Sequence, residues 1–129
     1  MYNTRRRILS VDDERDMHQI FALIFAKLGH DVVSVNNPLS ALVLARNQDF
    51  DLFILDRLFT EGTGVDLCKR IRESDPSTPV VFFSGDGTES ARNESFKAGA
   101  QAHITKPDIA GLLSTVNALL DRKRSAVSV

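Results

Sequence analysis

Residues 8–13 read Ile-Leu-Ser-Val-Asp-Asp, a short apolar run that ends in two adjacent carboxylates. Residues 52–56, Leu-Phe-Ile-Leu-Asp, repeat this form, and residues 102–106, Ala-His-Ile-Thr-Lys, end a third run with an amine. Short apolar runs separated by helical stretches are typical of parallel strands that are buried on both faces. In such a sheet the ligand site lies outside the carboxyl ends of the strands. The sequence therefore predicts three carboxylates and one amine at a single edge of the sheet.

This set of charges points to a metal site. Asp12, Asp13 and Asp56 cannot all stay ionised at close range without a counter-cation. A hard divalent ion, Mg²⁺ above all, meets that need because it takes oxygen ligands and keeps several waters. With Lys106 at the same edge, the constellation indicates acyl-phosphate chemistry on an aspartate.

The composition indicates one globular domain. The 129 residues predict a single core at about residues 7–122, between a short basic N-terminal arm and a C-terminal tail. Hydrophobic content of 43% and charged content of 26% are typical of a folded chain. The net charge of -1 gives no reason to expect nucleic acid or an anionic membrane as a partner. The basic clusters at residues 5–7 and 122–124 are interpreted as solvated termini, with a nucleic-acid role as the alternative.

The location is predicted from what the chain lacks. A single cysteine, Cys68, excludes internal disulfides, and its place on a helical stripe indicates packing. No apolar stretch is long enough to cross a bilayer, and the basic start is not followed by a signal-type run. The sequence therefore predicts a cytoplasmic protein without a membrane partner.

Strands and helices alternate along the chain. Apolar positions at helical spacing, together with capping residues such as Asn37 and Asp108, locate the helices. The predicted strands are residues 8–11, 30–35, 52–55, 79–83 and 102–104; the helices are residues 17–28, a segment from Pro38, a segment around 67–71, and residues 89–98 and 109–120. This alternation predicts right-handed βαβ units and an α/β fold with a doubly wound parallel sheet.

The helix at residues 89–98 is the least apolar of the five. Its expected anchors are Ala91, Phe96 and Ala98, with Ser95 at a position where an apolar residue would hold it more firmly. Because a buried apolar side chain contributes roughly 1.5–3 kcal/mol, this helix is held weakly. It is either a poorly packed edge helix or an element that moves, since switching segments come from the less stable parts of a fold.

From residue 7 to about residue 122, the chain resembles the receiver domain of two-component response regulators. The resemblance rests on an acidic pair after the first strand, an aspartate after the third, a hydroxyl residue after the fourth and Lys-Pro after the fifth. These stand here as Val11-Asp12-Asp13, Leu55-Asp56, Ser84-Gly85 and Thr105-Lys106-Pro107, with Gly64 and Gly99-Ala100 also in register. The resemblance implies the flavodoxin-like strand order 2-1-3-4-5.

The same resemblance implies roles for the acidic residues. Asp56 would be the phospho-acceptor, its carboxylate attacking phosphorus. Mg²⁺ would be held by the side chains of Asp13 and Asp56 and by the backbone carbonyl of Leu58. Asp12 would reach the ion through a water.

Two further residues would contact the phosphoryl group. Lys106 would pair with one phosphoryl oxygen as a point charge, and the Ser84 hydroxyl would pair with another. The Lys106–Pro107 bond is expected to be cis, which would aim the lysine inward.

The resemblance also implies partners. The phosphoryl donor would be a phosphohistidine on a sensor histidine kinase or a histidine phosphotransfer protein. A downstream protein would bind the surface formed by helix 89–98, strand 102–104 and helix 109–120. The expected state is a monomer, or a weak dimer that depends on phosphorylation.

His103 departs from the family pattern, because the residue three before the lysine is usually Tyr or Phe and rotates inward on switching. An imidazole is smaller, polar and titrates near neutrality. We therefore expect an altered, pH-sensitive switch at His103, involving Ser84. The alternative is a half-exposed histidine without a switching role.

Other interpretations stay open at this point. Taken singly, Asp12-Asp13 could begin a helix and Ser84-Gly85 could mark a turn. A phosphorylation-independent docking module is one rival function. A magnesium-dependent phosphohydrolase is another, although Asp56-Arg57-Leu58 lacks the second acid of such enzymes. The prediction is a phospho-acceptor signalling domain and not an enzyme, either complete in itself or part of a larger protein.

Overall fold

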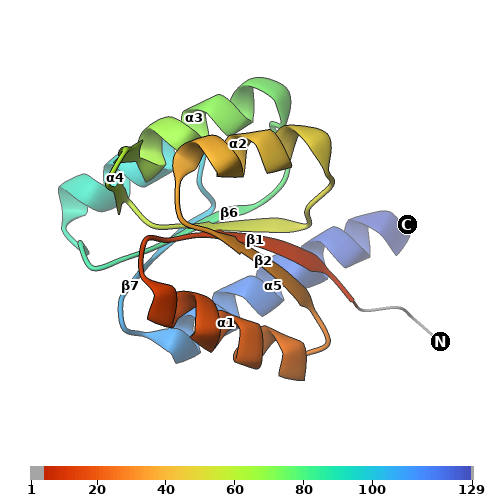
Figure 1. Ribbon diagram of the computed structural model, residues 1–129. Coiled ribbons are helices and arrows are strands. Elements are labelled where there is room, and N and C mark those ends of the chain that lie inside the picture. The colour runs from red at the N-terminus through yellow and green to blue at the C-terminus, as the bar shows by residue number, and fades with distance from the viewer. Residues whose placement is uncertain (1–4, 129) are drawn as a thin grey trace.

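The computed structural model describes the backbone of residues 5–128 and the side chains of residues 5–122. Its centre is a five-stranded parallel sheet in the order β2-β1-β3-β6-β7 (Figure 1). The strands are β1 (Arg7–Val11), β2 (Asp31–Val35), β3 (Leu52–Leu55), β6 (Val80–Ser84) and β7 (Ala102–Thr105). This confirms the predicted doubly wound sheet and the predicted strand order 2-1-3-4-5.

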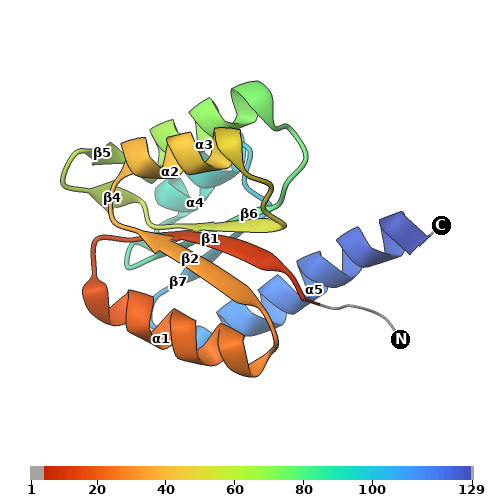
Figure 2. The ribbon, with the colours of Figure 1, turned by 45° about the vertical axis from the view of Figure 1, so that its right-hand side comes forward.

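Helices cover both faces of the sheet. On one face lie α2 (Pro38–Asn47), α3 (Gly64–Ser74) and α4 (Glu89–Lys97); on the other lie α1 (Arg15–Lys27) and α5 (Ile109–Ser128) (Figures 1 and 2). Consecutive strand residues point to opposite faces, so Phe53 and Leu55 pack beneath α2 and α3, whereas Leu52 and Ile54 pack against α1 and α5. The strands are continuous apolar runs because both of their faces are buried.

The segment after β3 contains strands that were not among those predicted. Residues Leu58–Phe59 (β4) and Gly62–Thr63 (β5) pair as a short antiparallel hairpin. Strands of two residues are too short to produce a recognisable alternation of polar and apolar positions. The hairpin leads directly into α3.

The last helix is longer than predicted. The expected helix ended near residue 120 and was followed by a frayed tail, whereas α5 continues to Ser128 and extends past the sheet (Figure 2). The prediction followed the apolar stripe, whose last members, Leu119 and Leu120, belong to the core on this face of the sheet. The side chains of Lys123 and Arg124 in the basic cluster lie outside the described part.

The orientation of α4 also differs from the prediction. Ala91 and Ala98 are buried as expected, but the expected anchor Phe96 is 44% exposed, and Ser95 is fully buried in its place. The helix thus presents the Ser95 hydroxyl to the sheet, at a position where the sequence already lacked an apolar residue, and the error in the prediction concerns Phe96.

Arg72 fastens the amino ends of β6 and β7 to α3. Its guanidinium donates to the Gly99 carbonyl at 2.8 and 3.1 Å, to the Thr78 carbonyl at 2.7 Å and to Oε1 of Gln101 at 3.0 Å. The same Gln101 oxygen accepts the Val80 amide at 2.7 Å. The turn between α4 and β7 is therefore tied to α3.

No helix within residues 5–128 is long and apolar enough to span a membrane.

Candidate functional site

The carboxyl ends of β1, β3 and β7 bring Asp12, Asp56 and Lys106 together. Lys106 Nζ donates to Oδ2 of Asp12 at 2.9 Å and to Oδ2 of Asp56 at 3.2 Å. The lysine side chain is 13% exposed and the Asp12 carboxylate is buried. The Lys106–Pro107 bond is cis, as the sequence indicated. Three residues that are up to 94 positions apart in the chain thus meet at one sheet edge.

Burial and the charge of the opposite partner have opposing effects on the pKa values of Asp56 and Lys106. Burial raises the pKa of Asp56, and the nearby Asp12 carboxylate raises it further, while Lys106 lowers it. For Lys106, burial lowers the pKa, but the hydrogen bond and charge of Asp12, with the charge of Asp56, outweigh it and raise the pKa above 10.5. The ammonium is therefore charged and holds two carboxylates that would otherwise repel each other.

The other expected metal ligands are Asp13, which contacts the β4–β5 hairpin, and Leu58, which belongs to it. Oδ2 of Asp13 accepts the Thr60 amide at 2.9 Å and the Thr60 hydroxyl at 3.2 Å, so it faces the loop between β4 and β5. Leu58 pairs with Thr63 in the hairpin, with its side chain exposed.

The oxygen donors here fit a hard divalent cation. Lys106 supplies one positive charge to the two carboxylates of Asp12 and Asp56, which leaves the pair with excess negative charge. Among the described residues, no three Asp, Glu, His or Cys side chains gather as a metal-binding group. Mg²⁺ does not need such a cage, because it binds through one or two carboxylates and keeps waters.

Ser84 ends β6 at the same sheet edge. Its side chain is buried, and its Oγ accepts the Asp86 amide at 3.2 Å. The Asp86 carboxylate accepts the Thr88 amide and hydroxyl, which lowers its pKa. The hydroxyl of Ser84 therefore stands at the start of a loop that leads into α4, which Thr88 caps.

His103 is buried, at 2% exposure, so the half-exposed alternative is wrong. Its Nδ1 lies 2.9 Å from Oγ of Ser95, and its Nε2 lies 2.9 Å from the carbonyl oxygen of Asp86. The ring stacks on Phe82 at a centroid distance of 6.3 Å. The imidazole of His103 therefore already points into the fold, and each of its ring nitrogens makes a hydrogen bond.

Two residues near the site were missed from the sequence. Arg57, next to Asp56, reaches α4: its Nη1 donates to the Ala91 carbonyl at 3.0 Å, and its Nη2 lies 3.4 Å from Oε2 of Glu94. Ser95 contacts His103 from the buried face of α4. The one available signal was the break in the apolar stripe at Ser95, which indicates a polar partner inside the fold.

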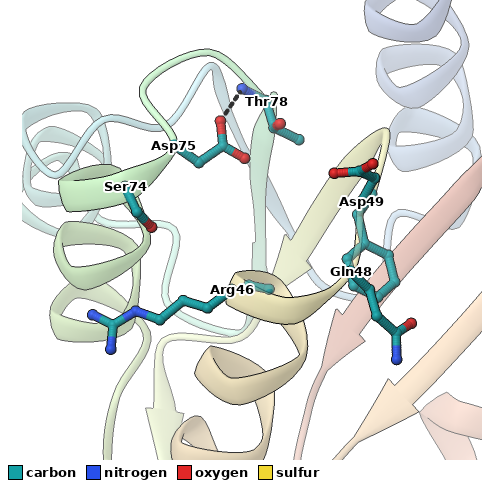
Figure 3. Close-up of a pocket in the computed structure, with 8 residues that line it drawn as sticks. Arg46, Gln48, Asp49, Ser74, Asp75 and Thr78 are labelled. Carbon is teal, nitrogen blue, oxygen red and sulfur yellow. Dashed lines mark hydrogen bonds between the residues drawn. The ribbon is translucent and has the colours of Figure 1, made fainter.

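A polar cavity lies at the opposite end of the sheet. It is lined by the carboxyl ends of α2 and α3 and by the segments that precede β3 and β6, and includes Arg46, Asp49 and Asp75 (Figure 3). Asp75 accepts the Thr78 amide at 3.0 Å, the contact drawn as a dashed line. The cavity is therefore remote from Asp56 and its lysine.

Comparison with known proteins decides the family. The family model of the response regulator receiver domain matches residues 8–117. The chain belongs to this family. It is a receiver domain of the response regulator type.

Individual relatives agree with this assignment. The chain is 31% identical to the response regulator protein PilR of Pseudomonas aeruginosa, over 95% of this chain and 27% of PilR. It is 27% identical to the receiver domain of the Francisella response regulator 1452, with a TM-score of 0.85 over 92% of this chain and 98% of that one. The chain thus spans about a quarter of the length of PilR.

A third relative shares the fold. The response regulator TrrA of Thermotoga maritima, solved in complex with Mg²⁺ and BeF, has a TM-score of 0.81 and 22% identity, over 88% of this chain and 98% of that one. At this identity the likeness concerns the fold alone.

The burial of His103 and His30 predicts a stability that depends on pH. Burial lowers the pKa of His103 below 6.5, and the charges of Arg92 and Arg57 lower it further. The hydrogen bond to the Asp86 carbonyl and the charge of the Asp86 carboxylate raise the pKa, but by less. The unfolded chain therefore binds more protons than the folded one near that pH. We expect the free energy of unfolding to fall as the pH drops through about 6.5 and to level off below the lowered pKa.

The test is urea unfolding between about pH 5 and pH 8 for the wild type, His103→Gln and His30→Gln. Burial lowers the pKa of His30 as well, with Arg6 as the second cause, so each variant should lose part of the slope. An unchanged slope in His103→Gln would show that its imidazole does not titrate differently on folding.

Proposed function

We propose that the receiver domain accepts a phosphoryl group from a phosphohistidine onto Asp56 in a Mg²⁺-dependent reaction and thereby alters its partner-binding surface. The observation that supports this most is the meeting of Asp12, Asp56 and Lys106 at the carboxyl edge of the sheet. A nucleophilic carboxylate beside a fixed ammonium suits phosphoryl transfer, where positioning and electrostatics supply most of the catalysis.

In the proposed step, a carboxylate oxygen of Asp56 forms a bond to phosphorus while the bond from phosphorus to the donor's imidazole nitrogen breaks. Oδ1 of Asp56 accepts the Arg57 amide at 2.7 Å, which orients the carboxylate. Lys106 would hold one phosphoryl oxygen by its charge, and the Ser84 hydroxyl would donate to another.

Asp13, Asp56 and the Leu58 carbonyl would hold Mg²⁺, with Asp12 reaching it through water. When bound, the ion neutralises negative charge on the transferring group. The complex of TrrA with Mg²⁺ and BeF supports this assignment by analogy. Asp12 would keep Lys106 in place through the contact at 2.9 Å.

The proposed donor is a sensor histidine kinase or a histidine phosphotransfer protein, in the cytoplasm. The proposed output is a downstream protein that binds the surface of α4, β7 and α5. Some curated relatives are transcriptional regulatory proteins, so DNA binding through another part of a longer chain is a second possible output. The domain itself would act as a signalling module and not as an enzyme with an external substrate.

The test is incubation with Mg²⁺ and acetyl phosphate followed by intact mass measurement. We expect one phosphate adduct that requires Mg²⁺ and is absent from Asp56→Asn. Asp49→Asn, which removes a carboxylate at the opposite end of the sheet, is the matched control and should keep the adduct.

Other outcomes distinguish the rival functions. A folded wild type without an adduct would favour a phosphorylation-independent docking module. Catalytic hydrolysis of a small phosphate ester would favour a phosphohydrolase. An adduct that survives in Asp56→Asn would place the acceptor elsewhere.

A further inference from the structure

Arg57 connects the proposed phosphorylation site to α4, because its guanidinium contacts two groups of that helix. Its amide binds the Asp56 carboxylate at 2.7 Å, while its guanidinium, mostly buried, contacts the Ala91 carbonyl and the Glu94 carboxylate. A side chain next to the acceptor thus holds α4 directly. Helix α4 offers few apolar contacts of its own, so these polar contacts carry more of its attachment.

The Ala91 carbonyl has a second neighbour, the Ser95 hydroxyl, at 3.1 Å. The same hydroxyl lies 2.9 Å from Nδ1 of His103. A hydroxyl has one hydrogen, so it donates to the carbonyl or to the imidazole, but not to both. The Ala91 carbonyl keeps the hydrogen bond from Arg57 when the Ser95 hydroxyl donates to the ring instead.

The other ring nitrogen fixes the direction of these bonds. A carbonyl oxygen only accepts, so the contact between Nε2 of His103 and the Asp86 carbonyl requires a proton on Nε2. In a neutral imidazole Nδ1 is then an acceptor, and the Ser95 hydroxyl must donate to it. Burial favours the neutral ring.

The connection returns to the site at Ser84. The Asp86 amide donates to Oγ of Ser84 at 3.2 Å, and the Asp86 carbonyl accepts from His103. Hydrogen bonds therefore run from the Ser95 hydroxyl of α4 through His103 and the backbone of Asp86 to the hydroxyl that would bind the phosphoryl group, while Arg57 holds the same helix separately at Ala91.

We infer that Arg57 and Ser95 are positioning residues that attach α4 to both sides of the phosphorylation site, with Ser95 holding His103 as the tautomer bonded to the Ser84 loop. This inference rests on the proposed function. If Ser84 turns its hydroxyl to a phosphoryl group, the Asp86 amide loses its acceptor and the loop withdraws its carbonyl from His103. The Ser95 contact is then weakened, and α4 loosens.

The test is amide hydrogen exchange of α4 with and without acetyl phosphate and Mg²⁺, in the wild type, Ser95→Ala and Arg57→Met. Intact mass reports the adduct on Asp56 in the same samples. We expect wild-type α4 amides to exchange about tenfold faster in the phosphorylated protein, a usual size for coupling between sites. In both variants α4 should exchange faster from the start, with little further change on phosphorylation.

Ser90→Ala is the matched control, since Ser90 is an exposed serine of the same helix, and it should behave as the wild type does. A full phosphorylation-dependent change in Ser95→Ala, with the adduct present, would overturn the inference and leave the proposed function intact. An adduct in the wild type without any change in α4 would also overturn it. Absence of the adduct would overturn the proposed function, and the inference with it.

A second readout is independent of phosphorylation. The ¹⁵N shifts of the imidazole should identify His103 as neutral, with its proton on Nε2, and His103→Phe assigns the signal. A proton on Nδ1 at neutral pH would contradict the proposed direction of the hydrogen bonds.

Discussion

Gly64→Ala is expected to destabilise the fold by about 3 kcal/mol or more and to abolish phosphorylation of Asp56. A Cβ at this position would overlap the backbone carbonyl oxygen of Asp56 and lie 2.9 Å from Cε1 of Phe82. The Gly64 amide also donates to the Arg57 carbonyl at 2.7 Å, so α3 begins in direct contact with the segment that follows Asp56. Either the loop or the helix must move to admit a methyl group.

Urea unfolding and the phosphate adduct measure the two effects. Gly85→Ala is the matched control, because a Cβ there meets no atom within 4 Å. Equal stability of Gly64→Ala and Gly85→Ala would show that the contact between Gly64 and Asp56 relaxes at little cost.

Lys106→Met is expected to lower the free energy of unfolding by about 3 kcal/mol without Mg²⁺, because it leaves the carboxylates of Asp12 and Asp56 without their shared cation. The same substitution should slow phosphorylation by about 100-fold, the usual effect of removing one charge-stabilising donor. Because Mg²⁺ supplies positive charge to the same carboxylates, it should stabilise the variant more than the wild type.

The measurements are urea unfolding with and without Mg²⁺ and the time course of adduct formation. Lys69→Met, at an exposed position of α3, is the control and should change neither. A Lys106→Met protein as stable as the wild type without Mg²⁺ would mean that the two carboxylates are already neutralised by protonation.

The edge of the sheet that carries the site could be predicted from the sequence. Apolar runs that end in Asp12, Asp56 and Lys106 are enough, because parallel strands bring their carboxyl ends to one edge. The cis bond before Pro107 was predicted from the resemblance of Lys106-Pro107 to the family motif, because proline permits a cis bond without requiring one.

The surroundings of α4 could not be predicted in the same way. Phe96 was expected to anchor the helix because it is apolar, whereas Ser95 faces the sheet. Ser95 meets His103 there, and the position of His103 opposite Ser95 depends on the register of β7. Neither residue alone indicates the other, and the contacts of Arg57 with Ala91 and Glu94 follow no motif. Specific polar contacts between elements are set by the packed fold and not by local periodicity.

The cluster around Arg72 determines how α4 can move. The carboxyl end of α4 is fixed, because Arg72 holds the Gly99 carbonyl and the Cys68 thiol donates to the Ala98 carbonyl at 3.3 Å. Its amino end begins with the exposed residue Glu89, just after the loop from Ser84. If the contacts of Arg57 and Ser95 are released, α4 is still held at Gly99, so a tilt would displace Glu89 the most and leave the turn before β7 in place.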